Sequence, residues 1–318
     1  PGRRMFLRFG GILRESWIFV NGEEVGVRNH GILPSEHDIT AVLREGRNEL
    51  AVYVTDYRRD ERGKTFVPTG ADQMSHQKGI WQDVHLCERP DVYIDDVTIR
   101  TSVRADELAV SMRIANASAT ARTVAGRFDV VERDAHHLSF ACPPITVAPG
   151  TTQDVDVSRA WHSYQAWSHR TPQLYTLVSS LYGDAAFLDE RRDRFGFREI
   201  WGDGHRIMLN GSPIHLFGEW CHKFSFDSFR PEYVRQWYRM LKDCNMNYIR
   251  THTYPHPSIL LDLADEMGIL VCVEAAWHFG GSFALDKEEL WQNGLQHVRD
   301  IIRRDKNHPS VVLWSVGN

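Results

Sequence analysis

The chain has 318 residues, of which 42% are hydrophobic and 25% charged, and its formal net charge is −5 at pH 7. This composition is ordinary for a folded chain, and the length suffices for two or three domains. The negative charge disfavours nucleic acid and anionic membrane surfaces, because both attract basic patches. No apolar run approaches the roughly 18 residues of a membrane span. We therefore expect neither nucleic acid nor a membrane as a partner.

Cysteine and aromatic content narrow the classes further. The five cysteines are scattered, odd in number and without a CxxC spacing, which disfavours a zinc site or a disulfide framework. The 10 Trp, 10 Tyr and 15 Phe have two interpretations. They can fill the cores of β-sandwiches, or they can stack on sugar rings. Composition alone favours the cores.

Residues 1–88 have the pattern of strands and turns. An Asn21-Gly22 step between apolar residues predicts a tight hairpin, since both residues tolerate positive φ. A polar, turn-rich stretch at 63–79 predicts a long loop. Strands are expected at residues 7–9, 16–20, 50–54 and 80–86.

The pattern restarts after Pro90, and residues 89–198 contain short strands without helices. The apolar residues of 108–114 alternate strictly with polar or small ones, as in a half-buried strand. Further strands are expected at 97–99, 124–130 and 174–181, with a turn at 148–150. This spacing predicts a small β-sandwich.

From about residue 205 onward strands alternate with helices, which predicts a parallel sheet covered by helices. Pro231 suits the first turn of a helix, and Gly268 suits a helix C-terminus. Strands are expected at 214–217, 248–250, 269–273 and 311–316, and helices at 231–241, 260–267 and 288–304. Four strands and three helices amount to half of an eight-stranded barrel.

Candidate site residues follow the ends of these four strands. In a parallel barrel the carboxyl ends of the strands share one rim, where active sites form. The residues at these ends are Trp220 and His222, Arg250 and His252, then Glu274, Trp277 and His278, and finally Asn318. Polar and aromatic side chains that meet at one rim predict a pocket for a polar substrate.

The same residues also have structural interpretations. Arg250 and Glu274 lie on neighbouring strands and can form a scaffolding ion pair. A single rim histidine is more often a satisfied polar residue than a catalyst, and the two tryptophans can cap the barrel core. Their equivalent positions at the strand ends favour the functional interpretation.

Four stretches carry a family resemblance. They are WIFVNGEEVG at 17–26, GIWQDV at 79–84, FGFRE at 195–199 and NHPSVVLWSVGN at 307–318. In this order they are similar to stretches of glycoside hydrolase family 2, the group of β-galactosidases, β-glucuronidases and β-mannosidases. The resemblance implies an N-terminally incomplete jelly-roll sugar-binding domain (1–88), an immunoglobulin-like sandwich (89–198) and the N-terminal half of a TIM barrel (199–318).

The resemblance also implies a chemistry, the retaining hydrolysis of β-glycosides by an exo-acting enzyme on a carbohydrate substrate. Asn318 matches the asparagine that binds the sugar hydroxyl next to the anomeric carbon. The acid/base Glu is expected directly after Asn318 and the nucleophile further along, so no catalytic residue falls within the chain. We therefore expect the chain to be an incomplete, inactive fragment. The resemblance requires no cofactor, and it allows a cation near the rim and a homo-oligomer.

Two positions depart from the family pattern. The family commonly has Arg-x-Ser-His-Tyr-Pro after the second strand, whereas this chain has its histidine one position earlier, at His252. Lys223 follows the histidine of the first strand, where an acidic residue is common. Both departures argue against assuming specificity for β-galactosides. The sugar, the aglycone and the cellular compartment stay open.

Two other classes of function compete with this one. A carbohydrate-binding protein without catalysis would keep the jelly roll and the rim aromatics. A metal-dependent hydrolase would use imidazole and carboxylate ligands, here His222, His252, His256 and Glu274. Pro255 and Pro257 disfavour a helical HxxxH arrangement, so the metal hypothesis is the weaker one.

Overall fold

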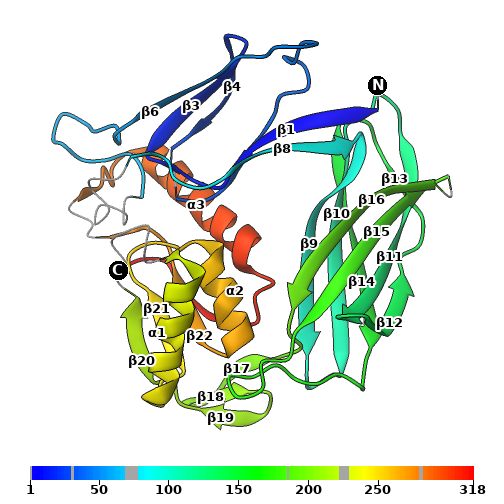
Figure 1. Ribbon diagram of the computed structural model, residues 1–318, viewed down its shortest axis with the longest axis vertical. Helices are drawn as coiled ribbons and strands as arrows, with labels where there is room; N and C mark the ends of the chain where they lie inside the picture. The colour runs from blue at the N-terminus through cyan, green and yellow to red at the C-terminus, as the bar shows by residue number, and fades with distance from the viewer. Residues whose placement is uncertain (1, 30–31, 69–77, 185, 222–228, 279–281) are drawn as a thin grey trace.

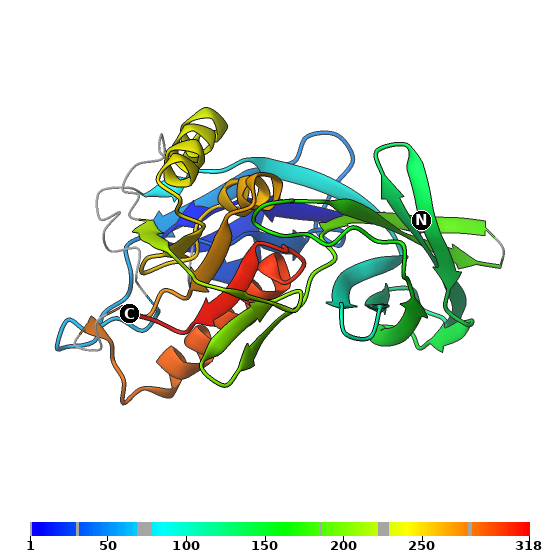
Figure 2. The same ribbon diagram turned by 90° about the horizontal axis from the view of Figure 1, so that it is seen from below.

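The structure is a computed structural model that describes residues 2–29, 32–68, 78–184, 186–221, 229–278 and 282–318. Figures 1 and 2 show three regions: a β-rich region at the start of the chain, a β-sandwich, and a parallel sheet with helices. No helix in the described part of the chain is both long and apolar enough to cross a membrane.

The first region contains two three-stranded antiparallel sheets, in the orders β5-β1-β8 and β4-β3-β6, and a short β2-β7 pair. Its core lies between the two sheets, with Phe9, Ile18 and Val20 at its centre. The expected hairpin is confirmed: Asn21 and Gly22 have φ of 54° and 85° between β3 and β4. The strands are β1 (Arg3–Phe9), β2 (Ile12–Leu13), β3 (Glu15–Val20), β4 (Glu23–Arg28), β5 (Ser35–Asp38), β6 (Leu50–Thr55), β7 (Gly79–Ile80) and β8 (Val84–Pro90).

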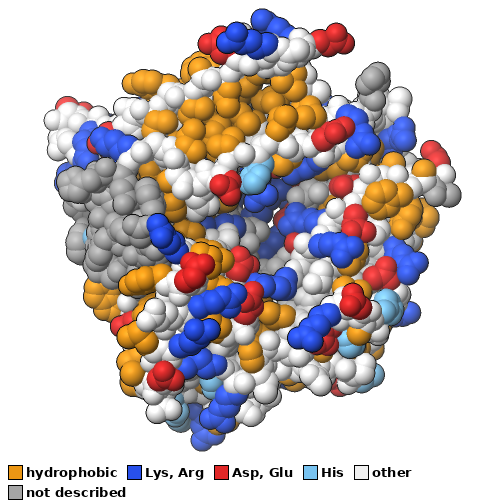
Figure 3. Space-filling view, viewed as in Figure 1, with side chains coloured by type: hydrophobic (Ala, Val, Ile, Leu, Met, Phe, Trp, Pro, Cys, Tyr) orange, Lys and Arg blue, Asp and Glu red, His pale blue; other side chains and the backbone are white. Residues whose placement is uncertain are grey.

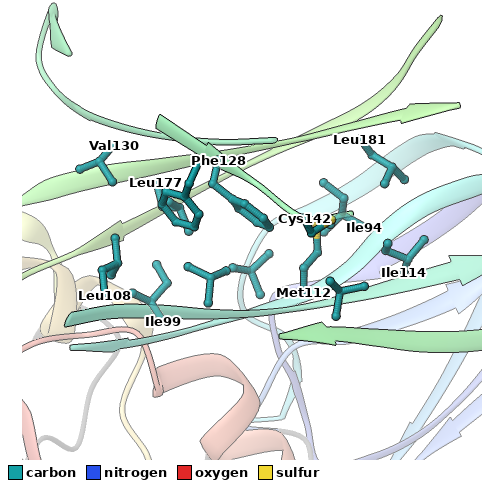
Figure 4. Packing of buried hydrophobic residues seen from close by; sticks show 14 of the residues in the cluster. Ile94, Ile99, Leu108, Met112, Ile114, Phe128, Val130, Cys142, Leu177 and Leu181 are labelled. Atoms are coloured by element: carbon teal, nitrogen blue, oxygen red, sulfur yellow. The ribbon is translucent and has the colours of Figure 1, made fainter. Parts of the chain in front are cut away.

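The second region is a sandwich of the sheets β14-β10-β9 and β12-β11-β15-β16, with β13 beside β11. Figure 4 shows Leu108 and Met112 of one sheet facing Phe128 and Leu177 of the other across an apolar core. This arrangement confirms the immunoglobulin-like sandwich. The strands are β9 (Val92–Ser102), β10 (Glu107–Asn116), β11 (Arg122–Glu132), β12 (Ala135–Ala141), β13 (Ile145–Val147), β14 (Thr151–Ala160), β15 (Tyr175–Gly183) and β16 (Ala186–Phe195).

The third region begins with a small antiparallel sheet, β17 (Ile200–Asp203), β18 (Arg206–Leu209) and β19 (Ser212–Ile214). A four-stranded parallel sheet in the order β20-β21-β22-β23 follows, which confirms the partial barrel. Its elements are β20 (Gly218–Cys221), α1 (Pro231–Asp243), β21 (Tyr248–Thr251), α2 (Ser258–Met267), β22 (Leu270–Glu274), α3 (Glu288–Asp305) and β23 (Val311–Ser315).

Two expected strands are wrong in detail. The apolar run at 214–217 does not form the first barrel strand, because an Asn210-Gly211 turn folds β19 back onto β18. The first barrel strand is β20, and its Gly218 lies so close to β21 that an added Cβ would be 1.7 Å from the Tyr248 carbonyl oxygen. The strand expected at 80–86 is interrupted, and its two parts belong to different sheets.

The helices form one layer against one face of the parallel sheet. Tyr238 of α1, Leu260 of α2 and Ile301 of α3 are buried against Ile249 and Val271 of the strands. The helix bounds follow the expected signals. Pro231 opens α1, and the residue at the C-cap of α2, Gly268, has φ of 69°.

The three regions contact one another through polar side chains. Arg28 of β4 lies 3.0 Å from Asp300 of α3, and Arg194 of β16 contacts Asp262 and Glu266 of α2. Figure 3 shows acidic and basic side chains interspersed over much of this face, while apolar ones gather over the first region. Both β-rich regions therefore contact the helices that cover the parallel sheet.

Candidate functional site

The site residues occupy the face of the parallel sheet that the helices leave uncovered. Ile249 and Val273 pack into the helix-side core, so the alternating positions Arg250 and Glu274 face the opposite side. Trp220 pairs in register with Arg250 and shares that side. Trp220 therefore lies within β20 and does not follow it, which corrects the expected strand bounds.

Arg250, Glu274 and Asn318 form a connected group. Arg250 Nε lies 3.2 Å from Glu274 Oε2, and Arg250 Nη2 donates a hydrogen bond of 2.8 Å to Asn318 Oδ1. Glu274 is 1% exposed, whereas the Asn318 side chain is exposed. The expected ion pair between neighbouring strand ends is thus present, and its arginine also holds the asparagine of the fourth strand.

Trp220, His252 and His278 form an aromatic wall beside this group. The Trp220 and His252 rings are 4.5 Å apart at their centroids, and the His252 and His278 rings 6.1 Å. Trp220 is 50% exposed. Burial and the nearby Arg250 guanidinium lower the pKa of His252, so its imidazole is neutral near neutral pH and can both donate and accept.

Trp277 lies differently from Trp220. Its ring packs against Phe283 and Trp291 at centroid distances of 5.5 and 5.3 Å, and a Cβ added at Gly294 of α3 would be 2.1 Å from it. Trp277, His278 and Asn318 border an apolar cavity of about 460 Å³ on the α3 side. The packing matches the core-capping interpretation of Trp277 more closely than the stacking one.

The first region contributes to the wall of this cavity. Thr65 N donates to Ser282 O at 2.9 Å, and Ala284 N donates to Thr65 O at 3.0 Å, which flanks Phe283 on both sides. Thr65 itself is fully buried. A loop of the β-rich region thereby fixes the segment that carries an aromatic side chain of the pocket.

Among the residues that the structure describes, those of the metal hypothesis do not form a group that could share an ion at the rim. His222 lies outside the described residues. His256 is buried and its Nε2 lies 3.2 Å from the Cys221 carbonyl oxygen. Glu219 faces the helices, where it accepts a hydrogen bond from Trp237 Nε1 at 2.8 Å. Within the described ranges, the only group of at least three acidic, cysteine or histidine side chains that could share an ion lies elsewhere.

That group is at the opposite end of the strands and consists of Asp262, Asp265 and His308. Arg194 Nη2 already lies 3.0 Å from Asp262 and 3.6 Å from Asp265, and His308 Nδ1 is 2.6 Å from Asp265. These basic groups balance the carboxylates, so the cluster is satisfied by protein side chains. We derive no metal chemistry from it.

Two residues of the site were not among the predicted substrate-binding residues. Ser315 Oγ donates to Glu274 Oε2 at 2.8 Å, and Thr253 N donates to Glu274 Oε1 at 2.7 Å. The signal for Ser315 was its place on the fourth strand, in register with Glu274. The role of Thr253 could not be predicted from its residue type, because its contribution comes from a backbone N–H and a φ of 69°.

Comparison with protein families gives three consecutive matches. The model "Glycosyl hydrolases family 2, sugar binding domain" matches residues 2–90, "Glycosyl hydrolases family 2" matches 92–198, and "Glycosyl hydrolases family 2, TIM barrel domain" matches 200–318. Together they account for almost every residue.

Individual proteins are similar along the same length. A β-galactosidase of Priestia megaterium is 31% identical over 99% of this chain and 32% of its own length. The β-glucuronidase of Bacteroides uniformis shares the fold with a TM-score of 0.84 at 23% identity, over 98% of this chain and 38% of its own. A calcium-binding mutant of Bacteroides uniformis β-glucuronidase 2 has a TM-score of 0.82 at 23% identity, over 98% and 39%. The chain thus spans about a third of the curated relative.

Proposed function

The chain belongs to glycoside hydrolase family 2, and on this basis we propose that its protein is a retaining exo-β-glycosidase. The observation that carries the proposal is the Arg250–Asn318 contact at the carboxyl ends of parallel strands, beside an exposed aromatic wall. Because the chain corresponds to about a third of the curated relative, the activity is proposed for the protein as a whole.

In this proposal the described residues bind and orient the sugar. Arg250 takes the amide oxygen of Asn318, which leaves the amide N–H groups to donate to the hydroxyl next to the anomeric carbon. Trp220 supplies an apolar face for the C–H surface of the ring, and His252 supplies a neutral donor and acceptor beside it.

The bond cleavage itself needs two carboxyl groups about 5–5.5 Å apart, one acting as nucleophile and one as acid and then base. The two carboxylates on the described parallel strands, Glu219 and Glu274, do not fill these roles. Glu219 faces the helices, and Glu274 is buried among three protein partners. We assign the acid/base to the position after Asn318 and the nucleophile to a later strand, as the resemblance implies.

The experiment uses the product of the full open reading frame that encodes this chain. It is assayed on a panel of aryl β-glycosides that includes β-galactosides, β-glucuronides and β-mannosides, and NMR follows the anomer formed first. Release of the β-anomer supports retention, and release of the α-anomer contradicts it. Saturable sugar binding without hydrolysis of any substrate would favour a carbohydrate-binding protein instead.

A further inference from the structure

Glu274 is the centre of a hydrogen-bond network with no surface left for substrate. Its side chain is 1% exposed, its Oε1 accepts from Thr253 N, and its Oε2 accepts from Ser315 Oγ. Arg250 Nε is 3.2 Å from the same Oε2. An ionised carboxylate only accepts hydrogen bonds, so Thr253 N and Ser315 Oγ donate to it, while the Arg250 guanidinium forms an ion pair with it. Glu274 is therefore an internal anchor.

Two of these neighbours lead to Asn318. Arg250 donates from Nη2 to Asn318 Oδ1 at 2.8 Å. Ser315 Oγ also lies 3.2 Å from the carbonyl oxygen of Gly317, the residue before Asn318. A hydroxyl has a single proton, and a carboxylate is the stronger acceptor, so Ser315 donates to Glu274 and packs against the Gly317 carbonyl.

The network determines which end of the Asn318 amide faces a ligand. A guanidinium has only donors, so it must meet the amide oxygen and not the amide nitrogen. The backbone is fixed as well, because Asn318 N donates to Trp277 O at 2.8 Å. With its oxygen held by Arg250, Asn318 presents two N–H donors to the sugar.

The third neighbour holds an unfavourable backbone conformation. Thr253 is β-branched and has φ of 69°, a region that such residues rarely adopt. Its N–H donates to Glu274, whereas its Oγ1 is buried and has no hydrogen-bond partner among the described residues. The turn follows His252 directly, so the same carboxylate that holds Asn318 also fixes the backbone beside the aromatic wall.

We infer that Ser315 is a positioning residue, which acts on substrate through Glu274 and Asn318 without touching it. This inference rests on the proposed function for its kinetic consequence. The hydroxyl keeps Glu274 in place, Glu274 keeps Arg250 in place, and Arg250 keeps the N–H groups of Asn318 directed at the sugar. A hydrogen bond to that sugar hydroxyl strengthens in the transition state, so a loosened Asn318 lowers kcat more than it raises KM.

The first test is a double-mutant cycle in the product of the full open reading frame. Ser315→Ala should lower kcat/KM about tenfold, or about 1.4 kcal/mol, mostly through kcat. In the Asn318→Ala background the same change should have almost no further effect. Ser315→Thr keeps the hydroxyl and should recover most of the activity. Equal losses in both backgrounds would show that Ser315 does not act through Asn318.

Ser310→Ala is the matched control. Ser310 lies just before the same strand, is fully buried, and its hydroxyl has no hydrogen-bond partner among the described residues. Its removal should leave kcat and KM unchanged. If Ser315 has a purely structural role, Ser315→Ala should lower the melting temperature, and the loss of activity should follow the loss of folded protein. The kcat calculated per folded molecule would then equal that of the wild type. That result would overturn the inference.

A second readout does not need activity. In ¹H–¹⁵N spectra, the side-chain amide signals of Asn318, assigned through Asn318→Asp, should shift in Ser315→Ala and stay fixed in Ser310→Ala. Unmoved signals in Ser315→Ala overturn the inference even if the enzyme is active. An inactive wild-type protein with shifted signals overturns the proposed function and supports the network.

Discussion

A buried carboxylate lies at each end of the parallel sheet, Glu274 on β22 and Asp265 on α2, and the two have different partners. Glu274 at the rim is 1% exposed, and Asp265 at the base is 0% exposed. Asp265 accepts from Ser310 N at 3.0 Å and lies 2.6 Å from His308 Nδ1. Its third neighbour, Arg194, comes from the β-sandwich, so the base carboxylate joins two regions.

At the rim, the arginine that pairs with Glu274 is partly exposed to solvent instead. The Arg250 side chain is 34% exposed and ends on the exposed Asn318. The rim also contains the unfavourable turn at Thr253, a type of strain that proteins keep mainly at functional sites. The comparison teaches that a carboxylate closed in by structural partners holds the fold together. A carboxylate whose partner contacts an exposed residue instead orients the side chains of a site. This difference agrees with the general rule for barrels, in which one end of the strands serves stability and the other carries the site.

The largest effect should follow from removing the buried carboxylate at the end of the sheet opposite the rim. Asp265→Ala leaves His308 and Arg194 without their shared acceptor, so we expect the free energy of unfolding to fall by about 3–5 kcal/mol. Denaturant titration measures it. Asp262→Ala is the control, because that carboxylate is 43% exposed and its loss should cost about 1 kcal/mol or less. Equal losses in the two variants would contradict the distinction between base and surface.

The two tryptophans should separate binding from stability. Trp220→Ala should weaken transition-state binding by about 1–3 kcal/mol through lost stacking, with little change in melting temperature. Trp277→Ala should lower the free energy of unfolding by about 2 kcal/mol, because its ring is packed against Phe283 and α3. Steady-state kinetics and denaturant titration are compared on both. If both variants keep full kcat/KM, neither ring contacts substrate.

The rim ion pair should show moderate coupling. In a cycle of Arg250→Met and Glu274→Gln, the double variant should be more stable than the sum of the singles predicts, by about 1–2 kcal/mol. The value stays below that for a fully buried pair because Arg250 is one-third exposed. Strict additivity in the free energies of unfolding would show that the two side chains act independently.

The smallest effect should be the pH dependence of stability that His308 contributes, at the end of the sheet opposite the rim. Burial tends to lower the pKa of His308, but Asp265 outweighs burial and raises it above the ordinary value. A raised pKa in the folded state stabilises the protein below about pH 6.5 and loses that contribution as pH rises through the folded value. The melting temperature should therefore fall less in His308→Gln than in the wild type between about pH 6 and pH 9. Parallel curves would contradict this.

Sequence alone predicted the elements whose pattern is local. Strict alternation identified β10, and the Asn21-Gly22 step identified the first hairpin. The strand expected at 214–217 was wrong because an apolar run does not reveal whether it pairs with the preceding strand or with a strand that follows it in the chain. The preceding Asn210-Gly211 turn decided that, with φ of 52° and 84°.

The sequence predicted which residues lie at the strand ends, but not how their side chains are oriented there. Counting to the ends of parallel strands placed Arg250, Glu274 and Asn318 together, because that edge is shared. The direction of the Trp277 ring depended on Gly294 in a helix that follows it. The part played by Ser315 depended on the register between β22 and β23, which tertiary packing sets.

The bridge between Thr65 and the segment at Phe283 makes the cavity wall a shared property of two domains. Thr65 and its partner Ser282 are 217 residues apart in sequence. Substitutions within 57–67 can therefore reshape the wall while every strand of the barrel keeps its sequence. Selection for a different cavity shape then has a route that leaves the parallel strands untouched, and a library restricted to this loop is the place to begin it.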